Sequence, residues 1–240
     1  MRSGTRPFGR VGEAASVAVV ERVSHRIEPL LRGTEALSDP ADLAVFTSQI
    51  AVARVFSDSR LSSRFRESLA GGRVVAVGPA TARALARRGV TADIVATGST
   101  RGILDSLPRE LEGVRILLPR GTDSKPELPE ELTRRGARVA LLELYRKVAE
   151  PRDPALDREI LDHPFAAFCA TSPSAARWLF SGRGEAAAGR LRQTAAVALG
   201  PSTRELLVSR GVERVEVCRP ATFSQAARLL ESLAGARPDA

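Results

Sequence analysis

The sequence predicts an α/β protein with two parallel-sheet domains, and three observations support this fold class. Short apolar runs alternate with helical segments along most of the 240 residues. The runs are uniformly apolar, as expected for parallel strands that are covered on both faces. The third observation is a duplication: VVAVGPATARALARRG at 74–89 returns as AVALGPSTRELLVSRG at 196–211, and residue numbers in the two copies differ by 122.

The alternation is regular from Leu43 onward. Each copy of the repeat predicts a strand, a turn and a helix, because Pro suits the first helical position and Gly the position after the last turn. The five strands are enough for one flavodoxin-like domain. We expect strands at 43–46, 73–77, 92–95, 114–118 and 138–142, and helices at about 49–57, 60–69, 79–88, 101–111 and 125–135.

The second half repeats this pattern, and two crossovers separate it from the first. Segments 21–42 and 143–155 are interpreted as passages between the domains. The predicted domains are therefore 29–150 and a split domain built from 1–28 and 151–240. In the split domain we expect strands at 166–169, 195–199 and 214–217, and helices near 174–180, 186–192, 201–209 and 223–234.

The N-terminal region predicts at most a short helix at 9–15 and a strand at Val17–Val20, which matches Val139–Leu142 at the same offset. The strand at 114–118 has no such counterpart, because its place 122 residues earlier falls before Met1. We therefore expect the split domain to lack its opening strand. Either the start is placed too late, or the N-terminal residues substitute for that strand.

The net charge of +8 favours an anionic partner. Nucleic acid is one candidate, but basic residues are dispersed among 28 acidic ones, and aromatic residues make up only 4% of the chain. A polyanionic small molecule fits this charge equally well. The sequence has no Ser-His-Asp arrangement, P-loop or GxGxxG motif, so hydrolase, kinase and dehydrogenase functions have no support.

Cys169 and Cys218 are interpreted as reduced structural residues. The two histidines, His25 and His163, lie far apart without ligands at metal-binding spacing, so we expect no metal. No apolar run approaches a membrane span, and the N-terminus has no signal-peptide core. We expect a cytoplasmic monomer that does not associate with membranes.

The two copies of the repeat place Thr81 and Thr203 in the first turn of a helix. Backbone N–H groups there lack intrahelical acceptors and the helix dipole is positive, which suits a carboxylate or phosphate. In an open α/β sheet this turn lies at the carboxyl ends of the strands, where ligands bind. The alternative, that each threonine only satisfies its own helix start, remains open.

Further hydroxyl groups occupy other junctions between strands and helices. Capping is the alternative for each of them. Together they predict a cleft lined by hydroxyls and backbone amides from both domains, able to hold several carboxylates. These candidates are Thr47, Ser48, Ser99, Thr100, Thr171, Ser172, Ser202 and Thr222, and Arg120 and Lys125 near the strand at 114–118 could also face the cleft.

Tyr145, the single tyrosine, lies where the chain leaves the continuous domain. Its phenol could donate a proton or hydrogen bond to a leaving hydroxyl. The alternative is a packing role on the crossover.

The chain resembles the uroporphyrinogen-III synthase family. The resemblance rests on VAVGPATARALARRGV, ILLPRGTDSKPELPEELTRRGARVALLELYRKV, ALGPSTRELLVSRGV, and the Thr-Ser junctions at 47–48 and 171–172, and it runs from about Val17 to Leu233. It implies two flavodoxin-like domains joined by a two-stranded hinge, the first built from both chain ends. The family's opening strand, which ends in Arg, has no counterpart here.

The implied reaction closes the linear tetrapyrrole hydroxymethylbilane to uroporphyrinogen III in haem biosynthesis. The last pyrrole ring is inverted, water is lost and no cofactor is used. The substrate is a polycarboxylate, and family members pass through an azafulvene and a spiro intermediate. By motif, Thr81, Ser172, Ser202 and Thr203 match positions around the family's cleft, and Tyr145 is the favoured proton donor.

Two other functions remain as hypotheses. One is a truncated or degenerate synthase domain that binds a tetrapyrrole or another anion without catalysis. The other is nucleic-acid binding through the arginine-rich helices, which we do not expect.

Overall fold

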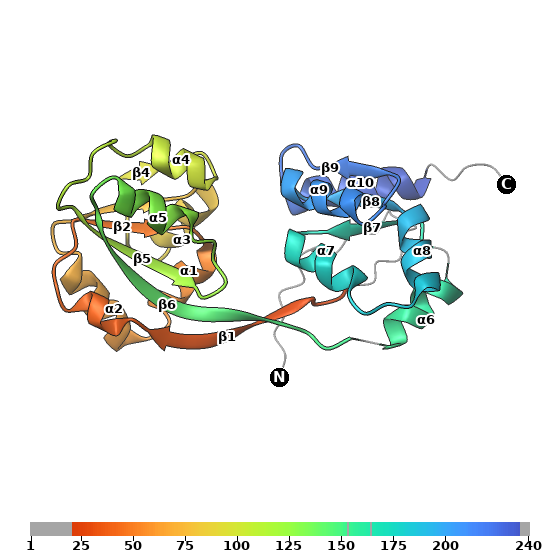
Figure 1. Ribbon diagram of the computed structural model, residues 1–240, viewed down its shortest axis with the longest axis horizontal. Coiled ribbons are helices and arrows are strands. Elements are labelled where there is room, and N and C mark those ends of the chain that lie inside the picture. The colour runs from red at the N-terminus through yellow and green to blue at the C-terminus, as the bar shows by residue number, and fades with distance from the viewer. Residues whose placement is uncertain (1–20, 153, 164, 236–240) are drawn as a thin grey trace. The chain divides into compact units, whose positions relative to one another are not determined.

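The computed structural model describes residues 21–152, 154–163 and 165–235 (Figure 1). The chain folds into two compact units. The continuous unit comprises 27–148, and the split unit comprises the chain up to 26 and from 149 onward. These boundaries fall two residues before each predicted one. The α/β class is confirmed in both units. The predicted helix at 9–15 and the strand at Val17–Val20 lie outside the described residues.

The continuous unit contains a six-stranded sheet in the order β1-β6-β5-β2-β3-β4 (Figure 1). Its strands are β1 (His25–Arg32), β2 (Leu43–Phe46), β3 (Arg73–Ala76), β4 (Ile94–Val95), β5 (Arg115–Gly121) and β6 (Arg138–Ala149). Its helices are the 3-10 helix η1 (Thr34–Leu37) and α1 (Gln49–Val55), α2 (Ser59–Ser68), α3 (Pro79–Ala86), α4 (Thr100–Asp105) and α5 (Glu127–Arg134).

Strands β2 to β6 are parallel, but their order corrects the flavodoxin-like prediction. Taken in chain order they lie 3-2-1-4-5, whereas flavodoxin has the order 2-1-3-4-5. The third strand, β4, is only two residues long and Val95 is half exposed, so it suits the sheet edge beyond β3 better than a central position. The order reverses between β2 and β5, which are neighbours.

The continuous unit buries both faces of its sheet. All four residues of β2 are buried, as the uniformly apolar run predicts. Phe46 packs on one face under α1, α2 and α3, with its ring 5.5 Å from that of Phe65. Val45 points to the opposite face, where Ile116 and Leu132 pack beneath α4 and α5. Alternate residues of each strand thus supply two separate cores.

The segment 21–42 contains a strand, in line with the two strands that the family resemblance implies, whereas its residue pattern alone suggested an irregular crossover. It contains β1 and η1, and β1 pairs with β6. The backbone bond from Glu150 N to Ser24 O and the ion pair of Arg146 with Glu28 show that the two strands run antiparallel. Pro29 suggested a break, but an edge strand tolerates proline. The second crossover is likewise mostly strand, because β6 continues to Ala149.

The split unit contains a three-stranded parallel sheet in the order β7-β8-β9. Its strands are β7 (Ala167–Ala170), β8 (Ala195–Ala198) and β9 (Val215–Val217). Its helices are α6 (Pro154–Asp162), α7 (Pro173–Phe180), α8 (Glu185–Gln193), α9 (Pro201–Ser209) and α10 (Phe223–Gly235). The sequence pattern missed α6, whose inner face consists of Leu156 and Ile160. The predicted absence of an opening strand stays a prediction.

The duplication is visible in the fold. Strand β8 and helix α9 begin 122 residues after β3 and α3, and β7-β8-β9 repeats the order β2-β3-β4. Among the described helices, none is long and apolar enough to cross a membrane.

A largely buried ion pair ties α6 to the segment after α7. Asp157 accepts hydrogen bonds from Arg152 and from Arg183, whose side chain is 2% exposed. Burial alone would raise the pKa of Asp157, but the two guanidinium groups outweigh it, and the pKa lies below its ordinary value.

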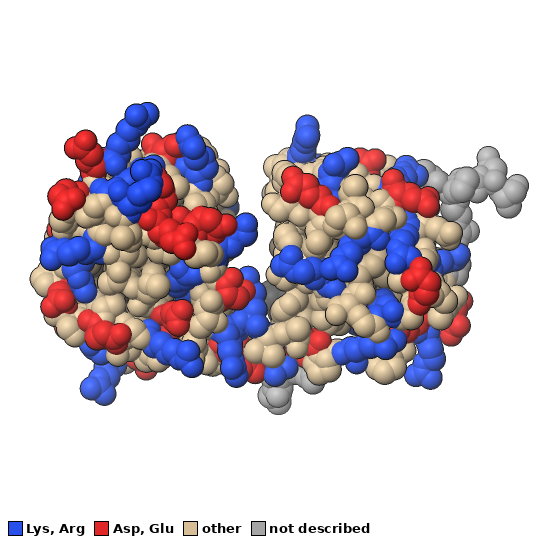
Figure 2. All heavy atoms as spheres, viewed as in Figure 1, with Lys and Arg blue, Asp and Glu red and all other residues tan. Residues whose placement is uncertain are grey.

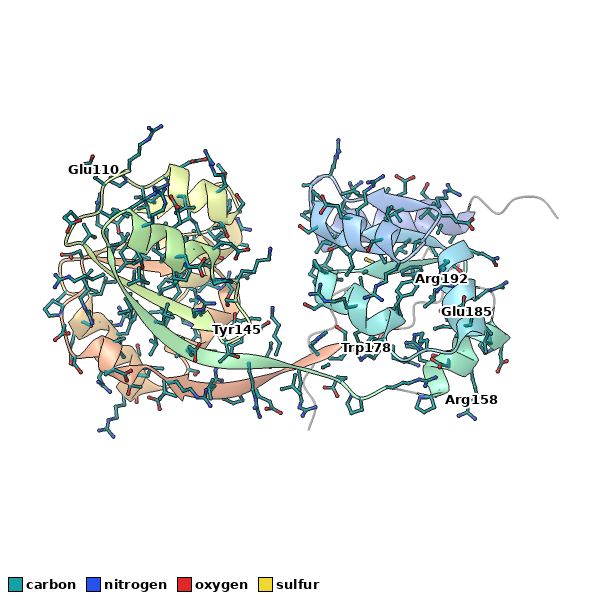
Figure 3. All side chains as sticks on the ribbon, in the orientation of Figure 1. Glu110, Tyr145, Arg158, Trp178, Glu185 and Arg192 are labelled. Atoms are coloured by element: carbon teal, nitrogen blue, oxygen red, sulfur yellow. The ribbon has the colours of Figure 1, made fainter. Side chains whose placement is uncertain are left out.

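We expect Asp157→Asn to lower the free energy of unfolding by about 3 kcal/mol at neutral pH, because Arg152 and the buried Arg183 both lose the charge of the Asp157 carboxylate. A depressed carboxyl pKa contributes stability above the unfolded-state pKa, and that stability is lost as pH falls through the folded-state pKa. The difference between wild type and variant should therefore shrink in acid. Denaturant titration followed by fluorescence of Trp178, the single tryptophan and part of the same unit, measures it (Figure 3).

Asp105→Asn is the matched control. Asp105 pairs with Arg101 on an exposed helix face, and its loss should cost less than about 1 kcal/mol. Equal losses in the two variants would contradict a special role for Asp157.

Candidate functional site

The two copies of the repeat form two helix N-termini without side-chain caps. Helix α3 follows Gly78 and helix α9 follows Gly200, each with proline at its start. Neither glycine can offer a side-chain acceptor to the free N–H groups of the first turn. Thr81 and Thr203 lie at the third helical position and are 4% and 3% exposed.

The hydroxyl groups of Thr81 and Thr203 make no hydrogen bond to any residue that the structure describes. Within the same ranges, Arg54 Nε is the one buried side-chain nitrogen or oxygen without a partner. Each threonine oxygen therefore retains contact with solvent although the residue around it is buried. The capping alternative is wrong for these two threonines, and each presents a free hydroxyl beside an uncapped, positive helix end.

Four of the other candidate hydroxyls act as caps. Ser48, Ser99, Ser172 and Thr222 each accept a hydrogen bond from the backbone N–H three residues later, at 3.0, 3.0, 3.1 and 3.2 Å. Capping is thus their observed structural role. Of the rest, Thr47 and Thr171 are half-buried and precede a cap, whereas Thr100 and Ser202 are exposed within the first helical turn.

In the continuous unit, parallel pairing brings the candidate turns to one sheet edge. Ser48 follows β2, Thr81 follows β3 and Ser99 follows β4. The turns after β3 and β4 nearly touch, since a Cβ added to Gly78 would lie 3.6 Å from Gly98 Cα. Ligands of open α/β sheets bind at this edge, where the strand order reverses.

The split unit repeats this arrangement. Thr171 and Ser172 follow β7, Ser202 and Thr203 follow β8, and Thr222 follows β9. Because these three strands are parallel neighbours, their candidate residues share one edge of the smaller sheet.

Tyr145 lies on β6 at the last position that pairs with β5 (Figure 3). Its hydroxyl is 3.1 Å from Ser48 Oγ, and either oxygen can be the donor. The side chain is only 4% exposed and packs in the core beneath α1 to α3. The structure therefore joins two candidates that lie 97 positions apart in the sequence.

A β-bulge gives Tyr145 this orientation. Arg120 of β5 pairs with Glu143 of β6, but the next residue, Gly121, pairs with Tyr145, so Leu144 is the extra residue. Such a bulge re-aims the following side chain, and Leu144 and Tyr145 both reach the same core. Gly121 leaves room for the ring, because a Cβ there would lie 2.6 Å from Tyr145 Cε2.

Arg120 is a buried cation at the same edge, 6% exposed. Its guanidinium donates to backbone carbonyls of the loop after β5, those of Gly121 at 3.3 Å, Lys125 at 3.4 Å and Ser124. Lys125 is instead exposed and lies near Glu127. The sequence suggested only that Arg120 could face the cleft. The signal for a more specific prediction was a charged residue directly after the buried run ILLP.

Other reactive groups of the described chain offer no site. Burial raises the pKa of Cys169 to about 12 and also raises that of Cys218, so both thiols are neutral at physiological pH. Across the described ranges, no group of three or more histidine, cysteine or acidic side chains could hold a metal ion. Basic and acidic side chains are interspersed over the face seen in Figure 2.

Comparisons with known proteins point to one family. A family model described as uroporphyrinogen-III synthase HemD matches residues 9–227. A Methanothermobacter thermautotrophicus protein, whose description as a uroporphyrinogen-III synthase is itself provisional, is 33% identical over 232 residues. The aligned region covers 88% of this chain and 90% of that protein.

Two solved structures have a similar fold. A mutant uroporphyrinogen III synthase from the extremely thermophilic bacterium Thermus thermophilus has a TM-score of 0.63 at 24% identity, over 87% of each chain. A uroporphyrinogen-III synthetase from Helicobacter pylori has a TM-score of 0.61 at 16% identity, over 88% of this chain and 92% of that one. At these identities the two structures establish the fold alone.

Proposed function

The chain belongs to the uroporphyrinogen-III synthase family, and we propose that it catalyses the family reaction in porphyrin biosynthesis. In this reaction hydroxymethylbilane is cyclised to uroporphyrinogen III, with inversion of the last pyrrole ring and loss of water. The observation that carries the proposal is the match of the family model to 219 consecutive positions, 9 through 227.

The binding chemistry of the two units supports a polycarboxylate substrate. Each unit offers an uncapped helix N-terminus with a free threonine hydroxyl, Thr81 in one and Thr203 in the other. Backbone N–H groups and hydroxyls bind carboxylates without a lysine for each one. Ser202 and Thr100 add exposed hydroxyls in the first turns of their helices. We propose that each of these turns can bind a carboxylate of the substrate.

The proposed chemistry is mainly control of orientation. A linear tetrapyrrole held with its last ring turned over closes to the inverted product in preference to the uninverted one. Tyr145 is the proposed proton donor to the leaving hydroxyl. Tyr145 is buried and its hydroxyl is hydrogen-bonded to the half-buried Ser48, with either hydroxyl able to donate. Ser48 would therefore pass the proton from Tyr145 to the leaving hydroxyl of the substrate.

The alternative is a family member that binds a tetrapyrrole without catalysis. The low exposure of Tyr145 is the observation that favours it, because a proton donor must reach the substrate directly or through a partner.

The proposed function is tested with freshly prepared hydroxymethylbilane, whose spontaneous closure yields the type I isomer. We expect the protein to direct closure to the type III isomer, and separation of the isomers measures it. Type I product alone would refute the synthase function. Type I product together with binding of uroporphyrinogen III would support the alternative.

We expect Thr81→Val and Thr203→Val each to weaken uroporphyrinogen III binding about two- to tenfold, the value of one hydrogen bond. Neither should change the free energy of unfolding much, because neither hydroxyl has a partner in the described part of the chain and valine has a similar shape. Ser172→Ala is the control, and loss of its cap should cost about 1 kcal/mol of stability. Unchanged binding in both threonine variants would contradict their assignment.

Tyr145→Phe should lower kcat roughly a hundredfold, the lower range for general acid catalysis, while the fold survives. Ser48→Ala should give a similar loss if the proton passes through Ser48, and the double variant should be no worse than either single one. Steady-state assays and unfolding curves measure the two effects separately. Full activity in Tyr145→Phe would remove Tyr145 as the acid.

A further inference from the structure

Arg120 is a buried cation without a counter-ion among the described residues. No carboxylate forms an ion pair with it, and this includes Glu143, its register partner on β6. Arg183 in the split unit is comparably buried but is paired with Asp157. A buried charge without a partner costs several kcal/mol, so the environment of Arg120 favours a bound anion.

The contacts of Arg120 leave one nitrogen free. Nε donates to Gly121 O, and Nη2 donates to Ser124 O and Lys125 O. These carbonyls fix the plane of the guanidinium but carry only partial charge. Nη1 has no partner within the described chain, and it is not among the buried unpaired atoms, so it reaches solvent. The free nitrogen of an immobilised guanidinium is well suited to a carboxylate oxygen.

The position of Arg120 links it to the candidate site. It lies at the carboxyl end of β5, next to the reversal of strand order between β2 and β5. The loop it holds contacts the Tyr145 segment, because Thr122 N donates to Tyr145 O at 3.0 Å and Gly121 packs against the tyrosine ring. Two of the carbonyls that it binds, those of Ser124 and Lys125, belong to the loop between β5 and α5.

We propose that Arg120 is a substrate-binding residue whose Nη1 donates a hydrogen bond to one carboxylate of the tetrapyrrole. The proposal rests on the proposed function, and it adds a charged contact to a site otherwise built from hydroxyls and backbone amides. Binding neutralises a charge that no described carboxylate compensates.

Arg115 provides a matched control on the same strand. Its guanidinium also donates to three backbone carbonyls, those of Ala36, Asp39 and Pro40, and its side chain is 13% exposed. It differs in two respects: it lies at the opposite end of β5, and the carboxylate of Asp39 is 3.6 Å away. An arginine that only pins a loop should behave like Arg115.

The test compares wild type, Arg120→Met and Arg115→Met for anaerobic binding of uroporphyrinogen III and for thermal unfolding with and without it. Loss of a hydrogen bond to a charged group should raise the Kd of Arg120→Met about ten- to hundredfold and shrink the ligand-induced rise in Tm. Arg115→Met should have a lower Tm than wild type but a Kd within about twofold of it. If Arg120 only holds its loop, the Kd of Arg120→Met will also stay within about twofold of that of wild type, and this result overturns the proposal.

Arg120→Lys decides the question if Arg120→Met does not fold. An ammonium keeps the charge but cannot bond the loop carbonyls and a carboxylate in the same geometry. The Kd of Arg120→Lys for uroporphyrinogen III should rise at least about fivefold, and a Kd equal to that of wild type overturns the proposal. Type III product from wild type with unchanged Kd in the Arg120 variants refutes the Arg120 assignment alone. Type I product alone from wild type, with no binding of uroporphyrinogen III, refutes both the assignment and the proposed function.

Discussion

Parallel pairing of β2 with its neighbours is the constraint on which the candidate site depends. Leu43 to Phe46 pair residue for residue with β3, and Leu43 and Ala44 pair with β5. Strands that run in one direction end at one edge, so the helices that follow them begin there. Free N–H groups, hydroxyls and the Arg120 loop therefore gather without any sequence proximity. The split unit applies the same constraint with β7, β8 and β9.

The Gly-Pro turn explains why the two threonines differ from the serine caps. Proline begins α3 and α9, so glycine occupies the capping position and threonine the third helical position. Ser48, Ser99 and Ser172 instead occupy the capping position itself. The former arrangement leaves a hydroxyl available to a ligand, whereas the latter uses it within the protein. A hydroxyl side chain thus has two roles, according to whether it occupies the capping position or the third helical position.

The sequence predicted what local chemistry determines: the buried strands, the helices that begin at Pro79 and Pro201, and the junctions at the strand ends. It could not predict features that depend on distant partners. The bulge at Leu144 turns Tyr145 into the core only because β5 advances one residue where β6 advances two. The residue pattern alone did not indicate strand β1, because its largely exposed pattern and Pro29 make sense only at a sheet edge. The bond between Ser48 and Tyr145 likewise joins residues that no local pattern connects.

Stability and function make opposite demands on the edge of the continuous unit. A protein optimised only for stability would pair Arg120 with an acid, as it pairs Arg183 with Asp157, and would cap α3 with a serine. Among the described residues Arg120 has no acidic partner, and α3 has no serine cap. Both omissions lie at the edge where open α/β sheets bind ligands. The groups left unsatisfied are a cation, a hydroxyl and backbone donors, all of which an incoming carboxylate can satisfy. Polar groups that lack protein partners thus carry more information about the ligand than those that have them.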